Sequence, residues 1–88
     1  MQEINRSKVL AHLSNSIGKR CSFSFIKKND EPRTIDGLLP YHFMDGATAG
    51  TKDKFPYILV LEINGGFRHV NLETLYEFSV ESEKYKIV

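Results

Sequence analysis

The histidines and the cysteine of this chain are the side chains that could take part in acid–base or nucleophilic chemistry. His12, His42 and His69 are far apart in the sequence and show neither the HxH nor the paired-cysteine spacing of a metal site. Cys21 falls on the apolar face of a predicted strand, whereas a nucleophilic cysteine must be partly exposed beside a base. We therefore expect no catalytic site, no bound metal and no cofactor, and we interpret Cys21 as a small buried hydrophobic residue.

Basic side chains could bind phosphates if the fold gathers them. They occur at both ends of a predicted strand at about residues 20–26, on the predicted strand opposite it at about 33–39, and after the predicted turn at Asn64-Gly65. In a small barrel the ends of alternate strands meet at one rim, so these residues could form a stripe along a nucleic-acid backbone, with Tyr41 or Phe67 as a stacking surface. The candidate nucleic-acid-binding residues are Lys19, Arg20, Lys27, Lys28, Arg33 and Arg68.

The same basic residues also have a structural interpretation. Acidic residues lie among them and would dilute such a stripe, and Arg68 could instead pair across the strands with Glu62. The whole chain carries a net charge of +1 from 12 basic and 11 acidic residues, so its overall charge gives no preference for nucleic acid.

Aromatic residues and a methionine flank the irregular segment 40–56. Such side chains are enriched at the centres of protein interfaces, although they could equally close one end of the barrel. The candidate protein-interaction residues are Tyr41, Phe43, Met44 and Phe55. An open edge strand, or the alternating C-terminal tail, could also pair with a second copy and give a homodimer.

Helical spacing of apolar residues places one helix at the N-terminal end, over about residues 5–17. Asn5 or Ser7 can cap its start, and Gly18 stands where a helix commonly ends. The apolar stripe that should cover the rest of the fold consists of Val9, Leu10, Leu13 and Ile17.

Five strands follow, because apolar and polar residues alternate from Arg20 onward. Gly37 suggests a bulge or a sharp bend, and Asn64-Gly65 predicts a two-residue hairpin turn with positive φ at both residues. The strand at 57–63 is apolar on both faces, so we expect it to be central or covered by the helix. The predicted strands cover about residues 20–26, 33–39, 57–63, 67–71 and 76–80.

These elements predict a mainly β (α+β) fold: an N-terminal helix followed by a five-stranded SH3-like small β-barrel. The barrel covers about residues 20–81, and the tail 82–88 is flexible or extends the last strand. The 88 residues suit a single domain, and a hydrophobic content of 41% is too high for a disordered chain. One cysteine forms no internal disulfide, and no apolar leader or membrane-length apolar run is present, so we expect a cytoplasmic protein that makes no contact with membranes.

Residues 20–80 resemble the WYL domain. In that family an aromatic-aliphatic strand leads through a turn to an aromatic-Arg-x-aromatic-x-Leu-Asp-x-Ile segment, which is similar to Phe-Arg-His-Val-Asn-Leu-Glu-Thr-Leu here. The family's opening hairpin, Phe-x-Tyr-x-Lys-x-Asp-Gly-x-x-Arg, is similar to the segment 21–35. Tyr57-Ile58-Leu59 replaces the triplet that names the family, and Val70 replaces a usual aromatic residue.

The resemblance implies nucleic-acid or nucleotide sensing, with Arg33 and Arg68 as the family ligand-binding positions that carry over. Short stand-alone versions with a leading helix are common among uncharacterised bacteriophage proteins, which implies the host cytoplasm as the compartment. The segment 35–44 has a weaker similarity to Sm-like RNA-binding rings, whose Gly-x-Leu-x-x-aromatic-Asp-x-x-Met stretch has its Asp replaced by His42 here.

Three functions are therefore expected in order. The first is a small non-enzymatic binding protein that acts on nucleic acid or on a complex that handles nucleic acid. The second is a protein-interaction module that binds and inhibits or redirects a host protein. The third is an Sm-like RNA-binding ring, which requires a stable hexamer or heptamer.

Overall fold

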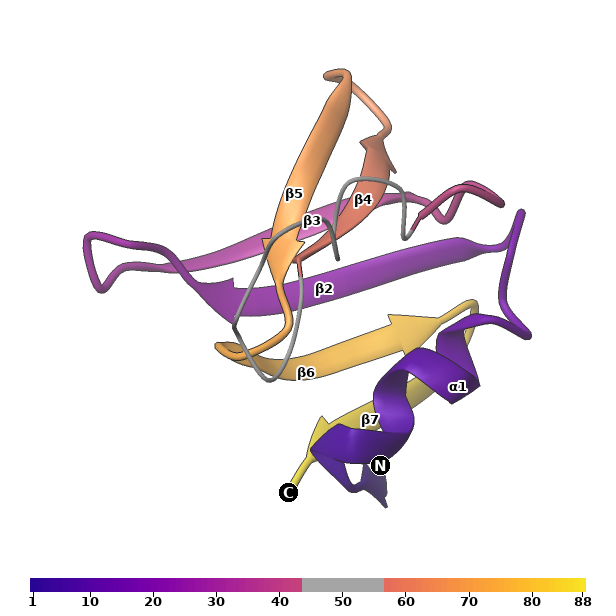
Figure 1. Cartoon of the computed structure of the whole chain (residues 1–88), viewed down its shortest axis with the longest axis vertical. Coiled ribbons are helices and arrows are strands. Elements are labelled where there is room, and N and C mark those ends of the chain that lie inside the picture. The colour runs from indigo at the N-terminus through magenta and orange to yellow at the C-terminus, as the bar shows by residue number, and fades with distance from the viewer. Residues whose placement is uncertain (44–56) are drawn as a thin grey trace.

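The computed structural model describes residues 1–43 and 57–88. In these residues a short helical segment accompanies an open mixed sheet of seven strands (Figure 1). The strand order across the sheet is β1-β7-β6-β2-β3-β4-β5, and all neighbours are antiparallel except β1 and β7. The elements are β1 (Gln2–Ile4), the 3₁₀ helix η1 (Arg6–Lys8), α1 (Val9–Leu13), β2 (Arg20–Ile26), β3 (Pro32–Leu38), β4 (Tyr57–Glu62), β5 (Phe67–Asn71), β6 (Leu75–Val80) and β7 (Glu83–Ile87).

Strand β2 lies in the middle of the sheet and supplies its hydrophobic centre. Its odd-numbered residues Cys21, Phe23 and Phe25 are buried, whereas the serines between them are half-buried on the other face. Phe23 lies opposite both Ile35 on β3 and Phe78 on β6, and the rings of Phe23 and Phe78 are stacked 6.2 Å apart. The alternation seen in the sequence therefore corresponds to one face packed on the core.

The five predicted strands are confirmed as β2 to β6, and the mainly β fold with a short N-terminal helix is confirmed with them. In the described residues the sheet has seven strands and is not closed into a barrel. The hydrogen-bonded sheet is open, with β1 and β5 at its edges. The tail forms β7, because Tyr85 and Ile87 are 9% and 8% exposed and belong to the core. Strand β1 pairs with β7 in parallel and brings the two chain ends together (Figure 1).

The helix is much shorter than the predicted 5–17. Asn5 does cap η1, since its Oδ1 accepts a hydrogen bond from the Ser7 N–H at 3.0 Å. The α-helix ends at Leu13. The Ser14 N–H still donates to the Leu10 carbonyl four residues back, but the Asn15 and Ser16 N–H groups donate to carbonyls three residues back, as in a 3₁₀ turn. The Ser14 hydroxyl also donates to the Leu10 and Ala11 carbonyls, which weakens the helix at this point. Ile17, expected in the apolar stripe, is 41% exposed.

Helix α1 lies against β6 and β7 (Figure 1). Val9 and Leu13 are buried in the core. The His12 ring is 4.5 Å from that of Tyr85 and 5.9 Å from that of Phe78. The helix therefore packs near β6 and β7 and does not cover β4. Of the two alternatives predicted for the strand at 57–63, the structure shows the interior position, since β4 lies between β3 and β5.

Two features predicted at glycines differ from the structure. Of the bulge or sharp bend predicted at Gly37, the β2–β3 ladder contains no bulge there, because its register runs through Gly37 without a shift. A Cβ at Gly37 would instead collide with the backbone carbonyl of Leu61, so the glycine allows β4 to approach. The β4–β5 turn is not of the two-residue primed type, because neither Asn64 nor Gly65 has a positive φ. It is wider and is closed by the Glu62 N–H, which donates to the Gly66 carbonyl at 3.0 Å.

None of the helices in residues 1–43 and 57–88 is long and apolar enough to cross a membrane.

We expect Gly37→Ala to lower the free energy of unfolding by about 1–3 kcal/mol, because the added methyl group must displace the backbone of β4. Urea denaturation followed by circular dichroism measures this change. Gly66→Ala is the matched control, since a Cβ there would meet no atom within 4 Å. Equal unfolding midpoints for the two variants would contradict the close approach of β4 to Gly37.

Candidate functional site

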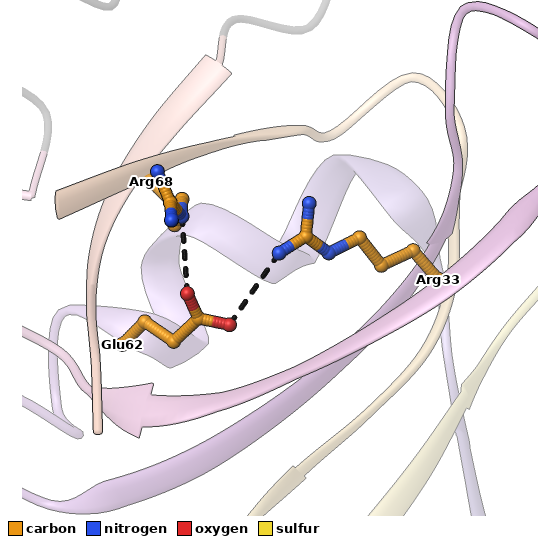
Figure 2. A network of polar contacts seen from close by, with 3 residues as sticks. All are labelled: Arg33, Glu62 and Arg68. Atoms are coloured by element: carbon orange, nitrogen blue, oxygen red, sulfur yellow. Dashed lines mark hydrogen bonds and ion pairs between the residues drawn. The ribbon is translucent and has the colours of Figure 1, made fainter. Parts of the chain in front are cut away.

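Arg33 and Arg68 contact the same carboxylate. The Arg68 Nε atom lies 3.0 Å from Glu62 Oε1, and the Arg33 Nη2 atom lies 3.5 Å from Glu62 Oε2. Figure 2 shows the two guanidinium groups approaching Glu62 from different strands. The predicted cross-strand pair of Arg68 and Glu62 is thus confirmed, and Arg33 joins it.

The β3–β4–β5 register explains this convergence. Glu62 lies opposite Gly37 on β3, and the Ile63 N–H donates to the Asp36 carbonyl at 3.1 Å, so the hairpin tip runs back along β3 toward Arg33. Arg68 pairs with Val60, two residues before Glu62 on the same face of the hairpin. The side chains of Arg33, Glu62 and Arg68 are therefore on the face that holds the core, at its rim.

The Arg33–Glu62–Arg68 cluster carries one positive charge in excess. Its side chains are 40%, 22% and 48% exposed, respectively, so water screens both ion pairs. An exposed pair of this kind contributes about 0–1 kcal/mol to folding. The excess charge and the exposure leave room for a second anionic group at the two guanidinium groups.

The other four basic candidates do not join this cluster. Lys19 and Arg20 lie at the start of β2, whereas Lys27 and Lys28 follow its end. A strand of seven residues separates the two pairs by roughly 20 Å. The predicted single rim does not form in the described residues. Strand β2 lies inside an open sheet, paired with β3 and β6, so the residues before it and after it lie at opposite ends of the strand and do not meet.

The predicted protein-interaction residues have different outcomes. Tyr41 is 82% exposed and remains a candidate. Phe43 is 4% exposed and belongs to the core, and its carbonyl accepts a hydrogen bond from the Leu59 N–H at 2.8 Å, so its assignment to an interface is wrong. Met44 and Phe55 lie outside the described residues.

An exposed apolar surface that the sequence analysis missed runs across three strands on the outer face. Leu38 lies opposite Leu61, and Leu61 lies opposite Phe67, so the register puts their side chains in one row. We call this surface the apolar strip, and with their exposed fractions its members are Leu38 (42%), Leu61 (37%), Ile63 (48%) and Phe67 (50%). A pocket of about 330 Å³ lies on the strip and is lined by Leu38, Leu61, Glu62, Ile63 and Gly65. A second pocket of about 360 Å³, beside α1 and β7, has a more polar lining that includes His12, Asn15 and Glu83.

Aromatic rings continue the apolar strip at one end. The His42 ring lies 5.5 Å from Phe67 and 5.2 Å from Tyr41, in edge-to-face geometry in both cases. At the other end of the row Arg20 lies opposite Leu38. The strip is therefore bordered by an aromatic pair and by a basic side chain, an arrangement typical of an apolar interface centre with a polar rim.

The sequence pattern that encodes the apolar strip is compatible with two structures, a strand covered on both faces and a strand with one exposed apolar face. The run from Tyr57 to Ile63 is apolar on both faces, which is typical of a strand covered on both sides. Ile58 and Val60 do face the core, but α1 lies on β6 and β7 and leaves Leu61 and Ile63 exposed.

Cys21 has the environment of a structural cysteine. Burial, and after it the Glu81 carboxylate, raises the pKa of the Cys21 thiol to about 11, while Lys19 acts in the opposite direction. The thiol is consequently protonated at neutral pH and is a poor nucleophile. In the described residues, no three His, Cys, Asp or Glu side chains are placed to hold a metal ion together.

Comparison of the chain with protein-family models, with curated proteins and with solved structures found no match.

The raised pKa of Cys21 predicts a loss of stability in alkali. Between about pH 9 and 11 the thiol ionises in the unfolded chain but remains protonated in the folded one, so the free energy of unfolding falls as pH rises. We expect the stability difference between the unaltered chain and Cys21→Ala to shrink over this interval, since the variant lacks the titrating group. Urea titrations of both proteins at several pH values measure it, and a constant difference would contradict the prediction.

Proposed function

We propose that this chain is a small non-enzymatic protein-interaction module whose partner binds the apolar strip. One observation carries the proposal: Leu38, Leu61 and Phe67 lie next to one another across β3, β4 and β5, and Ile63, just past β4, lines the same pocket as Leu38 and Leu61. Each of these four side chains is between 37% and 50% exposed. Contiguous exposed apolar surface of this kind marks interaction sites more often than isolated exposed residues do.

The position of the strip supports a binding role over a packing role. Leu39 and Val60, the neighbours of Leu38 and Leu61 in the chain, have exposed fractions of 0% and already fill the core on the other face. The strip side chains therefore add little to the core, while they keep apolar area in water. Burial of such area by a partner contributes about 25 cal/mol per Å² before the costs of association.

The SH3-like architecture is part of this proposal. Strands β2 to β5 form an antiparallel meander, and β6 returns beside β2, which supports such an arrangement without a closed barrel. The resemblance to stand-alone bacteriophage proteins makes a host protein the expected partner, which the module would inhibit or redirect.

Serine substitutions on the strip test this proposal. We expect Leu61→Ser and Phe67→Ser to abolish the capture of a partner from nuclease-treated lysate, and to change the free energy of unfolding by only about 0.5 kcal/mol because both side chains are exposed. Tyr76→Ser is the matched control, since it removes a ring that is 40% exposed on β6. If the strip variants retain the same partners as the control, the strip is not the interface.

Nucleic-acid binding is the second candidate function, and the convergence of Arg33 and Arg68 on Glu62 favours it. It ranks below protein interaction because Lys19 and Arg20 lie at the opposite end of β2 from Lys27 and Lys28, and in the described residues no ion pair joins these four residues to the cluster.

For this second function we expect labelled oligonucleotides to bind at low salt, with Arg33→Gln/Arg68→Gln weakening the binding. Each lost phosphate contact should reduce the log–log salt dependence by about 0.7–0.9. Lys84→Gln/Lys86→Gln on β7 removes the same charge at another place and should have a smaller effect. Equal effects of the two double variants, or no binding at low salt, would remove this candidate.

A further inference from the structure

The apolar strip ends at β5, which is an edge of the sheet. Within the described residues, the backbone groups of Phe67, Arg68 and His69 make no hydrogen bond outside the sheet ladder. The other end of β5 is held against β2, because the turn after it contains Thr74, whose hydroxyl donates to the Ile26 carbonyl at 2.8 Å. The hairpin tip instead projects away from β2 and β6 (Figure 1). Among residues 1–43 and 57–88, the length of this edge without a further backbone partner is therefore Phe67-Arg68-His69.

A strand added to this edge would meet two different surfaces. Its residue opposite Phe67 would lie on the outer face, where it continues the row of Leu38, Leu61 and Phe67. Its next residue would lie opposite Arg68 on the other face, because side chains alternate along a strand. That face presents the Arg33–Glu62–Arg68 cluster, which has two guanidinium groups for one carboxylate.

Resting on the proposed function, we propose that the partner contributes an extended segment that adds to β5 and places a carboxylate opposite Arg68. The segment has an apolar residue against Phe67 and, next to it in sequence, an aspartate or glutamate that binds the Arg68 and Arg33 guanidinium groups. Edge addition supplies backbone hydrogen bonds that depend little on sequence, and the two alternating side chains supply the specificity. Arg68 and Arg33 are 48% and 40% exposed, so a carboxylate can reach both.

A second copy of this chain does not fit the same edge. In an antiparallel two-fold pair that covers Phe67 to His69, Arg68 lies opposite Arg68 of the other copy, and like charges directly opposite each other are destabilising. The C-terminal tail does not offer a homodimer edge either, since β7 is paired with β6 on one side and with β1 on the other. The charge of the edge therefore selects an acidic segment of a different protein.

The test is a selection from a displayed library of random peptides long enough to span β5, against the full chain. We expect the enriched peptides to share an acidic residue next to an apolar one. We also expect Arg68→Glu to weaken the best peptide about tenfold or more, as for the loss of a hydrogen-bonded charge pair. The same peptide with lysine in place of its acidic residue should recover binding to Arg68→Glu, which a merely structural role of Arg68 does not predict. Arg68→Gln, with its stability measured in urea, controls for any loss of fold.

The outcomes separate the inference from the proposed function. Enriched peptides without an acidic preference, or an acidic preference that Arg68→Glu leaves unchanged, overturn the inference. If lysate partners are lost with Phe67→Ser but not with Arg68→Glu, the apolar strip is still supported as an interface, and the proposed acidic segment is rejected. If the lysate partners are lost with neither variant, both proposals are overturned. Both are also overturned if oligonucleotides displace the selected peptides from the Arg33–Arg68 pair and the apolar strip takes no part in peptide binding. The N–H groups of Phe67 and His69 face away from β4, because hydrogen-bonded and non-hydrogen-bonded pairs alternate along the β4–β5 ladder. Protection of these two amides from hydrogen exchange in the peptide complex is the direct sign of strand addition.

Discussion

The approach of the β4 backbone to Gly37 fixes the place of the β4–β5 hairpin. In the described residues the ladder between β3 and β4 consists of the pairs Gly37–Glu62 and Leu38–Leu61, and the Leu61 carbonyl occupies the space that a side chain at position 37 would need. The same two pairs put Leu38 and Leu61 in one row on the outer face and point Glu62 toward the core rim. The short β3–β4 ladder thus positions both surfaces: the apolar strip on the outer face of the sheet and the Arg33–Glu62–Arg68 cluster on the inner face.

The hairpin is attached to the body of the sheet mainly by its inner face. Ile58, Val60 and Val70 are fully buried and anchor the half of the hairpin nearest the core, while the tip beyond them relies on exposed ion pairs that contribute little to stability. Local stability should consequently decrease from Val70 toward Gly65. A binding surface at the less stable end of a firmly anchored element can adjust to a partner without disturbing the core.

Local patterns predicted the strands well because they depend on alternation within a few residues. The helix was overestimated because Ile17 fits the helical spacing, whereas α1 ends at Leu13, four residues earlier, where the backbone hydrogen bonds change to the 3₁₀ pattern. Strands β1 and β7 were not predicted as paired strands, since a parallel pairing between Ile4 and Ile87 has no signal in either segment alone. Arg6 was missed for the same reason: its Nη1 atom donates to the Leu72 and Leu75 carbonyls at 2.6 Å, in a turn far away in the sequence. For the site, the sequence indicated Arg33 and Arg68 but could not place the other basic residues, because their grouping depends on whether the sheet closes.

The parallel pairing of β1 with β7 has a consequence for how the chain is made. Gln2–Ile4 and α1 leave the ribosome well before their partners Phe78, Tyr85 and Ile87. Until then Val9 and Leu13 have only an incomplete surface to cover, and a helix of five residues is not stable alone. The meander β2–β5 can form as it emerges, whereas the segment 2–13 must wait for β6 and β7, so its docking follows the formation of the meander and leaves apolar side chains uncovered until then.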